Sequence, residues 1–144
     1  MAPLVRRPWS LTMADLTHML TQAVNLHQAG RLEEAAAVYQ QILKIEPGQS
    51  DALHLLGLTH YQSGRAEEGA HWIVRAIAEN PGMVEALANL GIVLADLGRR
   101  DESVASLRRA LALDPRHVGA RMALGNALML LERFDEALDG YRHA

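Results

Sequence analysis

Paired carboxylates are the side chains in this sequence that most resemble catalytic groups. Two neighbouring carboxylates can act as general acid and base. The pairs recur every 34 residues, however, and a helix N-terminus favours negative charge. We therefore interpret them as helix starts on a solvated face, not as an active site. The pairs are Glu33 and Glu34, Glu67 and Glu68, Asp101 and Glu102, and Asp135 and Glu136.

The seven histidines could bind a metal, and the chain has no cysteine. No His-Glu-x-x-His motif or close His/Asp spacing of a zinc site occurs. His27 and His54 could approach each other across neighbouring helices, with metal binding as the alternative, and His60 falls at a core position. Motifs for phosphate binding and for a nucleophilic serine are also missing. We expect no catalytic residue, no cofactor and no metal, so the protein should not be an enzyme.

Length and composition fit one folded domain. The chain has 144 residues, 49% of them hydrophobic, and a net charge of −3. This charge gives no electrostatic footprint for nucleic acid. No run approaches the roughly 20 apolar residues of a membrane span, and no apolar segment of a signal peptide follows the N-terminus. We expect a cytoplasmic protein with neither nucleic-acid nor membrane partners.

A 34-residue repeat organises the chain. One set of glycines falls where a first helix should end, because glycine adopts a left-handed turn most easily. A second set falls inside helices, which costs about 1 kcal/mol relative to alanine and suggests close helix contacts. The prolines then stop each second helix. The three sets are Gly30, Gly64 and Gly98; Gly57, Gly91 and Gly125; and Pro47, Pro81 and Pro115.

The repeat predicts eight helices in four antiparallel pairs. We expect them over 13–29, 32–45, 50–63, 66–79, 84–97, 100–113, 118–131 and 134–143. Thr12 and Asp15 form a capping box before the first helix. Residues 1–12 should be an N-terminal extension, and residues 13–144 one domain with units 16–49, 50–83, 84–117 and 118–144.

These markers resemble the tetratricopeptide repeat family over residues 16–144. The third unit matches best, through Leu87, Leu90, Gly91, Leu94, Leu107, Ala110 and Pro115. The resemblance implies an all-α, right-handed superhelical solenoid of four hairpins, with first helices lining a concave groove. In the fourth unit, Glu132 replaces the linker glycine. The run Asn89-Leu90-Gly91 is most similar to repeats fused to O-GlcNAc-transferase-like glycosyltransferases.

The implied groove carries no fixed charge, whereas the outer stripe of the second helices is rich in charges. A long apolar surface normally marks a binding site, so we expect a protein or peptide partner. Some family members grip acidic peptide C-termini with a Lys, Asn and Arg clamp, and here only Asn89 fits those positions. The predicted groove residues are Leu20, Val24, His27, His54, Leu58, Tyr61, Ala88, Asn89, Ile92, Ala95, Met122, Asn126 and Met129.

Three functions remain open from the sequence. The first is a scaffold that binds a peptide or helix of a partner, and the second is the N-terminal substrate-recognition arm of a larger enzyme such as a glycosyltransferase. The third is a self-association module, acting through the N-terminal segment or through Phe134, Leu138 and Tyr141 at the uncapped C-terminal end. The chain's own N-terminal segment or a second copy could also fill the groove. Trp72 lies on a second helix and is interpreted as a packing residue, with a partner contact as the alternative.

Overall fold

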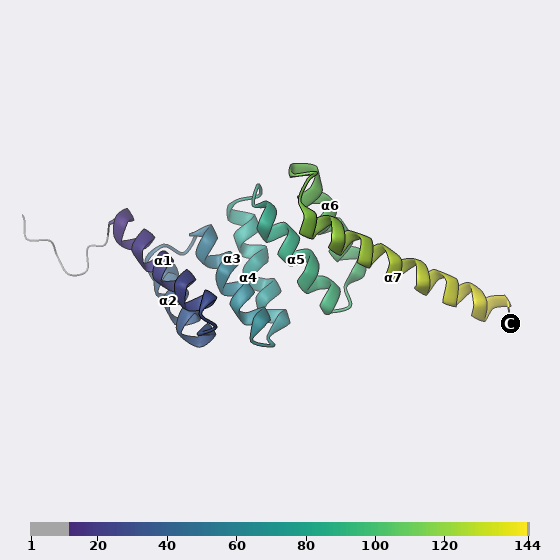
Figure 1. Cartoon of the computed structure of the whole chain (residues 1–144), viewed down its shortest axis with the longest axis horizontal. Coiled ribbons are helices and arrows are strands. Elements are labelled where there is room, and N and C mark those ends of the chain that lie inside the picture. The colour runs from purple at the N-terminus through teal and green to yellow at the C-terminus, as the bar shows by residue number, and fades with distance from the viewer. Residues whose placement is uncertain (1–11, 144) are drawn as a thin grey trace, which may run out of the picture.

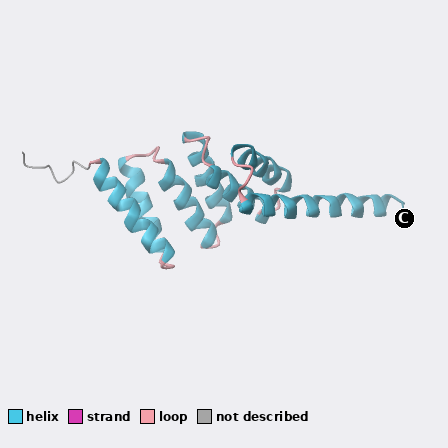
Figure 2. Ribbon diagram, turned by 45° about the horizontal axis from the view of Figure 1, so that its top comes forward, coloured by secondary structure: helices cyan, strands magenta, loops and turns pink. Residues whose placement is uncertain are grey.

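The computed structural model describes the backbone of residues 12–143 and the side chains of residues 12–133. This part of the chain contains seven α-helices and no strand (Figure 1). They are α1 (Met13–Gln28), α2 (Leu32–Ile45), α3 (Ser50–Gln62), α4 (Ala66–Glu79), α5 (Val84–Asp96), α6 (Arg100–Leu113) and α7 (Val118–His143). The first six form three antiparallel hairpins stacked side by side (Figures 1 and 2). The all-helical prediction is confirmed, and α1 to α6 begin and end within one residue of the predicted bounds.

Glycine turns join the two helices of each hairpin. Gly30, Gly64 and Gly98 have φ angles of 79°, 87° and 80°. In each turn the N–H of the following arginine donates to a carbonyl near the end of the first helix, for example Arg65 N to His60 O at 2.8 Å. This is the arrangement by which a left-handed glycine satisfies helix C-terminal carbonyls. The predicted capping box of Thr12 and Asp15 is also present.

Helix α7 corrects the prediction of eight helices and four hairpins. It runs without a break through 132 and 133, for 26 residues, or about 39 Å at 1.5 Å per residue. Its second half projects beyond the stack in both views (Figures 1 and 2). The residue one repeat after Gly98 is Glu132. A non-glycine residue pays a steric cost in a left-handed turn, so the helix continues.

Helix pairs meet closely at two of the interior glycines. A Cβ on Gly57 would lie 2.7 Å from the Gly69 carbonyl oxygen, and a Cβ on Gly91 would overlap the Leu107 side chain. The buried Ser103 hydroxyl also donates to the Gly91 carbonyl at 2.6 Å. The close-contact prediction is confirmed at these positions and is wrong at Gly125. There a Cβ would meet no atom of the described residues within 4 Å.

Ion pairs link successive hairpins at the starts of the second helices. Arg65 lies 3.4 Å from Glu33, and Arg99 lies 3.5 Å from Glu67. Three of the four acidic pairs thus occupy first helical turns as predicted, whereas Asp135 and Glu136 fall within α7. Glu33 and Glu67 each also pair with the next linker arginine. The two glutamates are largely exposed and the two arginines partly exposed, so each pair stabilises the fold little.

The described part of the chain begins at the last residue of the predicted N-terminal extension. Thr12 caps α1, whereas residues 1–11 lie outside the described part. The side chains of Phe134, Leu138 and Tyr141 also lie outside it. Among the described residues, no helix is both long enough and apolar enough to cross a membrane.

Candidate partner-binding face

The first helices α1, α3 and α5 are joined along one side of the stack by side-chain hydrogen bonds. His27 Nε2 donates to Gln62 Oε1 at 2.6 Å, and the Asn89 amide donates to His54 Nε2 at 2.9 Å. The hydroxyl of Tyr61 donates to an Asp96 carboxylate oxygen. Each bond joins residues 35 positions apart and fixes one first helix against the next. We call the outward side of α1, α3, α5 and α7 the first-helix face.

A hollow of about 370 Å³ opens on this face between α1 and α3. Its apolar wall comes from Val24, Leu55 and Leu58, and its polar rim from His27 and glutamines. Three of the predicted groove residues therefore line one concavity together. The lining residues are Val24, His27, Gln28, Tyr39, Leu55, Leu58 and Gln62.

The predicted groove residues divide into three groups by burial. His54 and Ala88 are only 7% and 2% exposed, so they lie between helices and offer little surface. Met122 and Met129 are 66% and 54% exposed on α7, and Asn126 is exposed beside them. The half-buried group has side chains anchored in the stack that keep an outer surface. It comprises Leu20, Val24, His27, Leu58, Tyr61, Asn89, Ile92 and Ala95.

Two polar residues at the edge of this face were missed by sequence reasoning. Gln62 binds His27, and Asp96 accepts from Tyr61. The bond to Asp96, with burial, raises the pKa of Tyr61 to about 12. The signal was a polar residue recurring at the end of each first helix, at Gln28, Gln62 and Asp96. The face therefore has an apolar middle and a polar edge that includes the Asp96 carboxylate.

The sequence offered His27 and His54 as an alternative metal site, and among the described residues no third ligand joins them. Within the described part of the chain, no three His, Cys, Asp or Glu side chains come together as a metal site. His27 instead contacts Gln62 and lies 3.4 Å from the Tyr39 hydroxyl. Both histidines take part in contacts between helices.

Acid is expected to destabilise the stack through His54. Burial lowers the pKa of His54 below its ordinary value of 6.5, an effect that Asp51 and Glu85 partly oppose and that His27 reinforces. Because the unfolded chain binds the proton more readily, the free energy of unfolding should fall as the pH drops below about 6.5. Circular dichroism melts between about pH 7.5 and about pH 5 measure this slope.

A His54→Gln variant keeps a polar side chain next to Asn89 and should lose part of the slope. The loss should be partial because burial and Arg65 also lower the pKa of His60. If the variant keeps the full pH dependence of the free energy of unfolding seen in the parent, then a group other than His54 causes it.

Comparisons with known proteins agree with the repeat pattern. Two family models described as tetratricopeptide repeat match residues 26–90 and 88–144. No curated protein shows significant similarity to the sequence. Among solved structures, an O-GlcNAc transferase mutant of Thermobaculum terrenum is 33% identical, with a TM-score of 0.78 over 83% of this chain. The chain spans only 23% of the length of that transferase.

Two further solved structures share the fold at lower identity. The first tetratricopeptide repeat domain of Spaghetti (RPAP3), bound to an HSP90 peptide, is 16% identical, with a TM-score of 0.81 over 85% of this chain and 97% of its own. The type III secretion translocator chaperone SycD of Yersinia enterocolitica is 17% identical, with a TM-score of 0.74 over 90% of each chain.

Proposed function

Because the chain belongs to the tetratricopeptide repeat family, we propose that its first-helix face binds an apolar peptide or helix of a partner protein. Repeats of this family typically mediate protein–protein interaction, and one similar structure has a peptide bound. The hollow between α1 and α3, with Val24, Leu55 and Leu58 in its wall, is the observation that carries the proposal. The protein acts as a scaffold, without catalysis, and its hairpins form a right-handed superhelix with this face on the concave side.

Affinity in this proposal comes mainly from apolar burial. Each Å² of apolar surface removed from water contributes about 25 cal/mol before the costs of ordering both partners. Binding should therefore depend weakly on salt. The acidic tail class of ligand fits poorly, because Asn89, the one residue that matches the clamp, already donates to His54.

Single charges on the first-helix face are expected to abolish binding. A peptide is first selected from a displayed library for binding to the parent chain, and its affinity is measured by calorimetry. Leu58→Asp and Ile92→Asp each place a charge against an apolar ligand, and we expect a loss of at least about 100-fold, or 3 kcal/mol. Both side chains are half-buried on first helices, so circular dichroism must show that the helices remain.

Leu113→Asp is the matched control. Leu113 is 53% exposed at the end of α6, so the same change adds a charge away from the first-helix face. It should leave the affinity within about twofold. If the selected peptide binds both face variants like the parent but no longer binds the Leu113→Asp variant, then the second helices carry the site.

We infer a second candidate function from the 33% identity to the transferase repeats, which cover 83% of this chain. In it the first-helix face presents protein substrates to a glycosyltransferase domain of the same polypeptide. The reading frame beyond codon 144 tests this proposal. A glycosyltransferase sequence there would support it, and a stop codon there would exclude it in this form.

We also propose that the chain associates with a second copy of itself. The C-terminal half of α7 projects from the stack (Figure 2) and offers a place where a second copy could dock. Light scattering over a range of concentrations tests it. A constant monomer mass at all concentrations would rule it out.

A further inference from the structure

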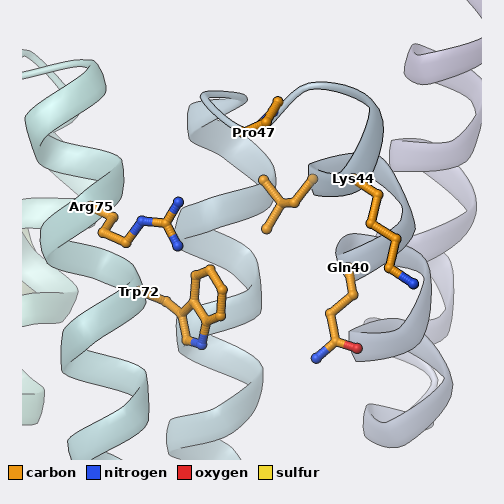
Figure 3. Close-up of a pocket in the computed structure, with 6 residues that line it drawn as sticks. Gln40, Lys44, Pro47, Trp72 and Arg75 are labelled. Atoms are coloured by element: carbon orange, nitrogen blue, oxygen red, sulfur yellow. The ribbon is translucent and has the colours of Figure 1, made fainter.

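A second hollow lies between α2 and α4, on the outward side of the second helices (Figure 3). We call the outward side of α2, α4 and α6 the second-helix face. Trp72 and Arg75 extend from α4 toward α2, and Gln40 and Lys44 belong to α2 (Figure 3). The hollow measures about 300 Å³, enough for one or two side chains. Its lining residues are Gln40, Leu43, Lys44, Pro47, Trp72 and Arg75.

The floor of this hollow is the indole ring of Trp72. The side chain is half-buried and packs partly against the core formed by α1, α2 and α3. One repeat earlier and one repeat later the same position holds Val38 and Ser106. Packing between second helices is thus achieved elsewhere by much smaller side chains. The extra ring surface of Trp72 remains available beside Leu43 and Pro47.

The Arg75 guanidinium lies at this floor, and Lys44 belongs to the opposite wall. The Arg75 guanidinium carbon is 4.8 Å from the centre of the Trp72 ring, a cation–π contact that holds the planar group in place. Lys44, the only lysine of the chain, lies on the opposite helix, α2, and also lines the hollow. Within residues 12–133 neither cation has an ion-pair partner. The hollow therefore combines an apolar floor with the guanidinium of Arg75, in a chain of net charge −3.

Another hollow near α4 and α6 differs in charge. It measures about 310 Å³ and combines Val74 and Leu94 with the carboxylates of Glu67 and Glu102. Arg99, which also lines it, already pairs with Glu67. An acidic ligand would be repelled there. The hollow at Trp72 is therefore the better match for negative charge.

We propose that the Trp72 hollow binds an acidic segment of a partner protein. A carboxylate of that segment pairs with the Arg75 guanidinium, and a neighbouring apolar side chain covers Trp72, Leu43 and Pro47. The small size of the hollow and the net negative charge of the chain favour one carboxylate over an extended polyanion such as nucleic acid. This site uses different helices from the first-helix face, so the chain can hold two partner segments at once.

Fluorescence of Trp72 tests the proposal directly. The chain has two tryptophans, so a Trp9→Phe background leaves Trp72 as the only indole. The probes are capped hexapeptides in which two glutamates flank a leucine or a phenylalanine, together with neutral versions that carry glutamine. We expect the acidic peptides to change Trp72 emission in a saturable way below about 1 mM and the neutral versions to bind at least about tenfold more weakly.

Charge reversal provides the matched comparison. Lys44→Glu combined with Arg75→Glu should weaken the acidic peptides at least about tenfold, as should raising the salt from about 0.1 M to about 1 M. Arg108→Glu combined with Arg109→Glu makes the same change in net charge on exposed positions of α6 and should leave binding unchanged. Leu58→Asp on the first-helix face should also leave it unchanged.

Three results would overturn the proposal. They are no emission change with any acidic peptide, equal binding of the acidic and neutral peptides, and parent-like binding by the Lys44 and Arg75 variant. None of these results bears on the first-helix face, because binding there is measured with a different peptide.

Discussion

Gly57→Ala is expected to destabilise the protein by about 1–3 kcal/mol, because it overpacks a contact between two helix backbones. The added Cβ would lie 2.7 Å from the Gly69 carbonyl oxygen and 3.0 Å from the Ile73 backbone nitrogen. Neither atom can move without shifting α4 against α3. Urea unfolding followed by circular dichroism measures the change.

The same substitution at two other repeat positions gives the control series. At Gly91 a Cβ would overlap Cγ of the fully buried Leu107 side chain, so Gly91→Ala should also destabilise the protein. At Gly125 no atom of the described residues lies within 4 Å, so Gly125→Ala should stabilise by up to about 1 kcal/mol through helix propensity alone. Equal effects at Gly57 and Gly125 would show that close packing does not explain the glycine period.

Glu132→Gly is expected to divide α7 into two helices. It restores the Gly-Arg sequence that ends each first helix at Gly30, Gly64 and Gly98. A fourth hairpin then becomes accessible, in which residues 134–143 lie antiparallel to residues 118–131. The ends of α7 are about 38 Å apart in a straight helix, whereas the ends of a hairpin of adjacent helices are about 10 Å apart.

Spin labels measure this distance without interference, because the chain has no cysteine. One label is placed at Val118 and the other at His143, the two ends of α7. The parent and a Glu132→Ala control should both give the long distance, and Glu132→Gly should give a large fraction at the short one. If the long distance persists alone in the glycine variant, then something other than residue 132 keeps α7 straight.

The stack from α1 to α6 could be predicted because each boundary has a local chemical cause. A left-handed glycine ends each first helix, an acidic pair begins each second helix, and a proline follows its end. The error at α7 arose where one of these causes was missing. The acidic pair of Asp135 and Glu136 suggested a new helix start, but Glu132 offered no turn to precede it.

The candidate site was less predictable, because burial depends on neighbouring helices. A stripe at i, i+4 and i+7 identifies one side of an isolated helix. In the stack, each first helix also meets the first helix of the next unit, and this contact encloses His54 and Ala88 while leaving Leu58 and Ile92 half-buried. The bond from Tyr61 to Asp96 depends on the same contact, so no single helix pattern contains it.

The links between hairpins join residues at a fixed spacing. This spacing restricts how a gene of this kind can change in length. Links such as Glu33 with Arg65 join only adjacent units. Loss of residues 50–83 would therefore bring Glu33 opposite Arg99, and His27 opposite Asp96 in place of Gln62. Tandem duplication of one unit would likewise create one new junction with matching partners. A single inserted residue within a helix would instead rotate every following side chain by about 100°. Evolution of such a chain should therefore proceed in whole units of 34 codons.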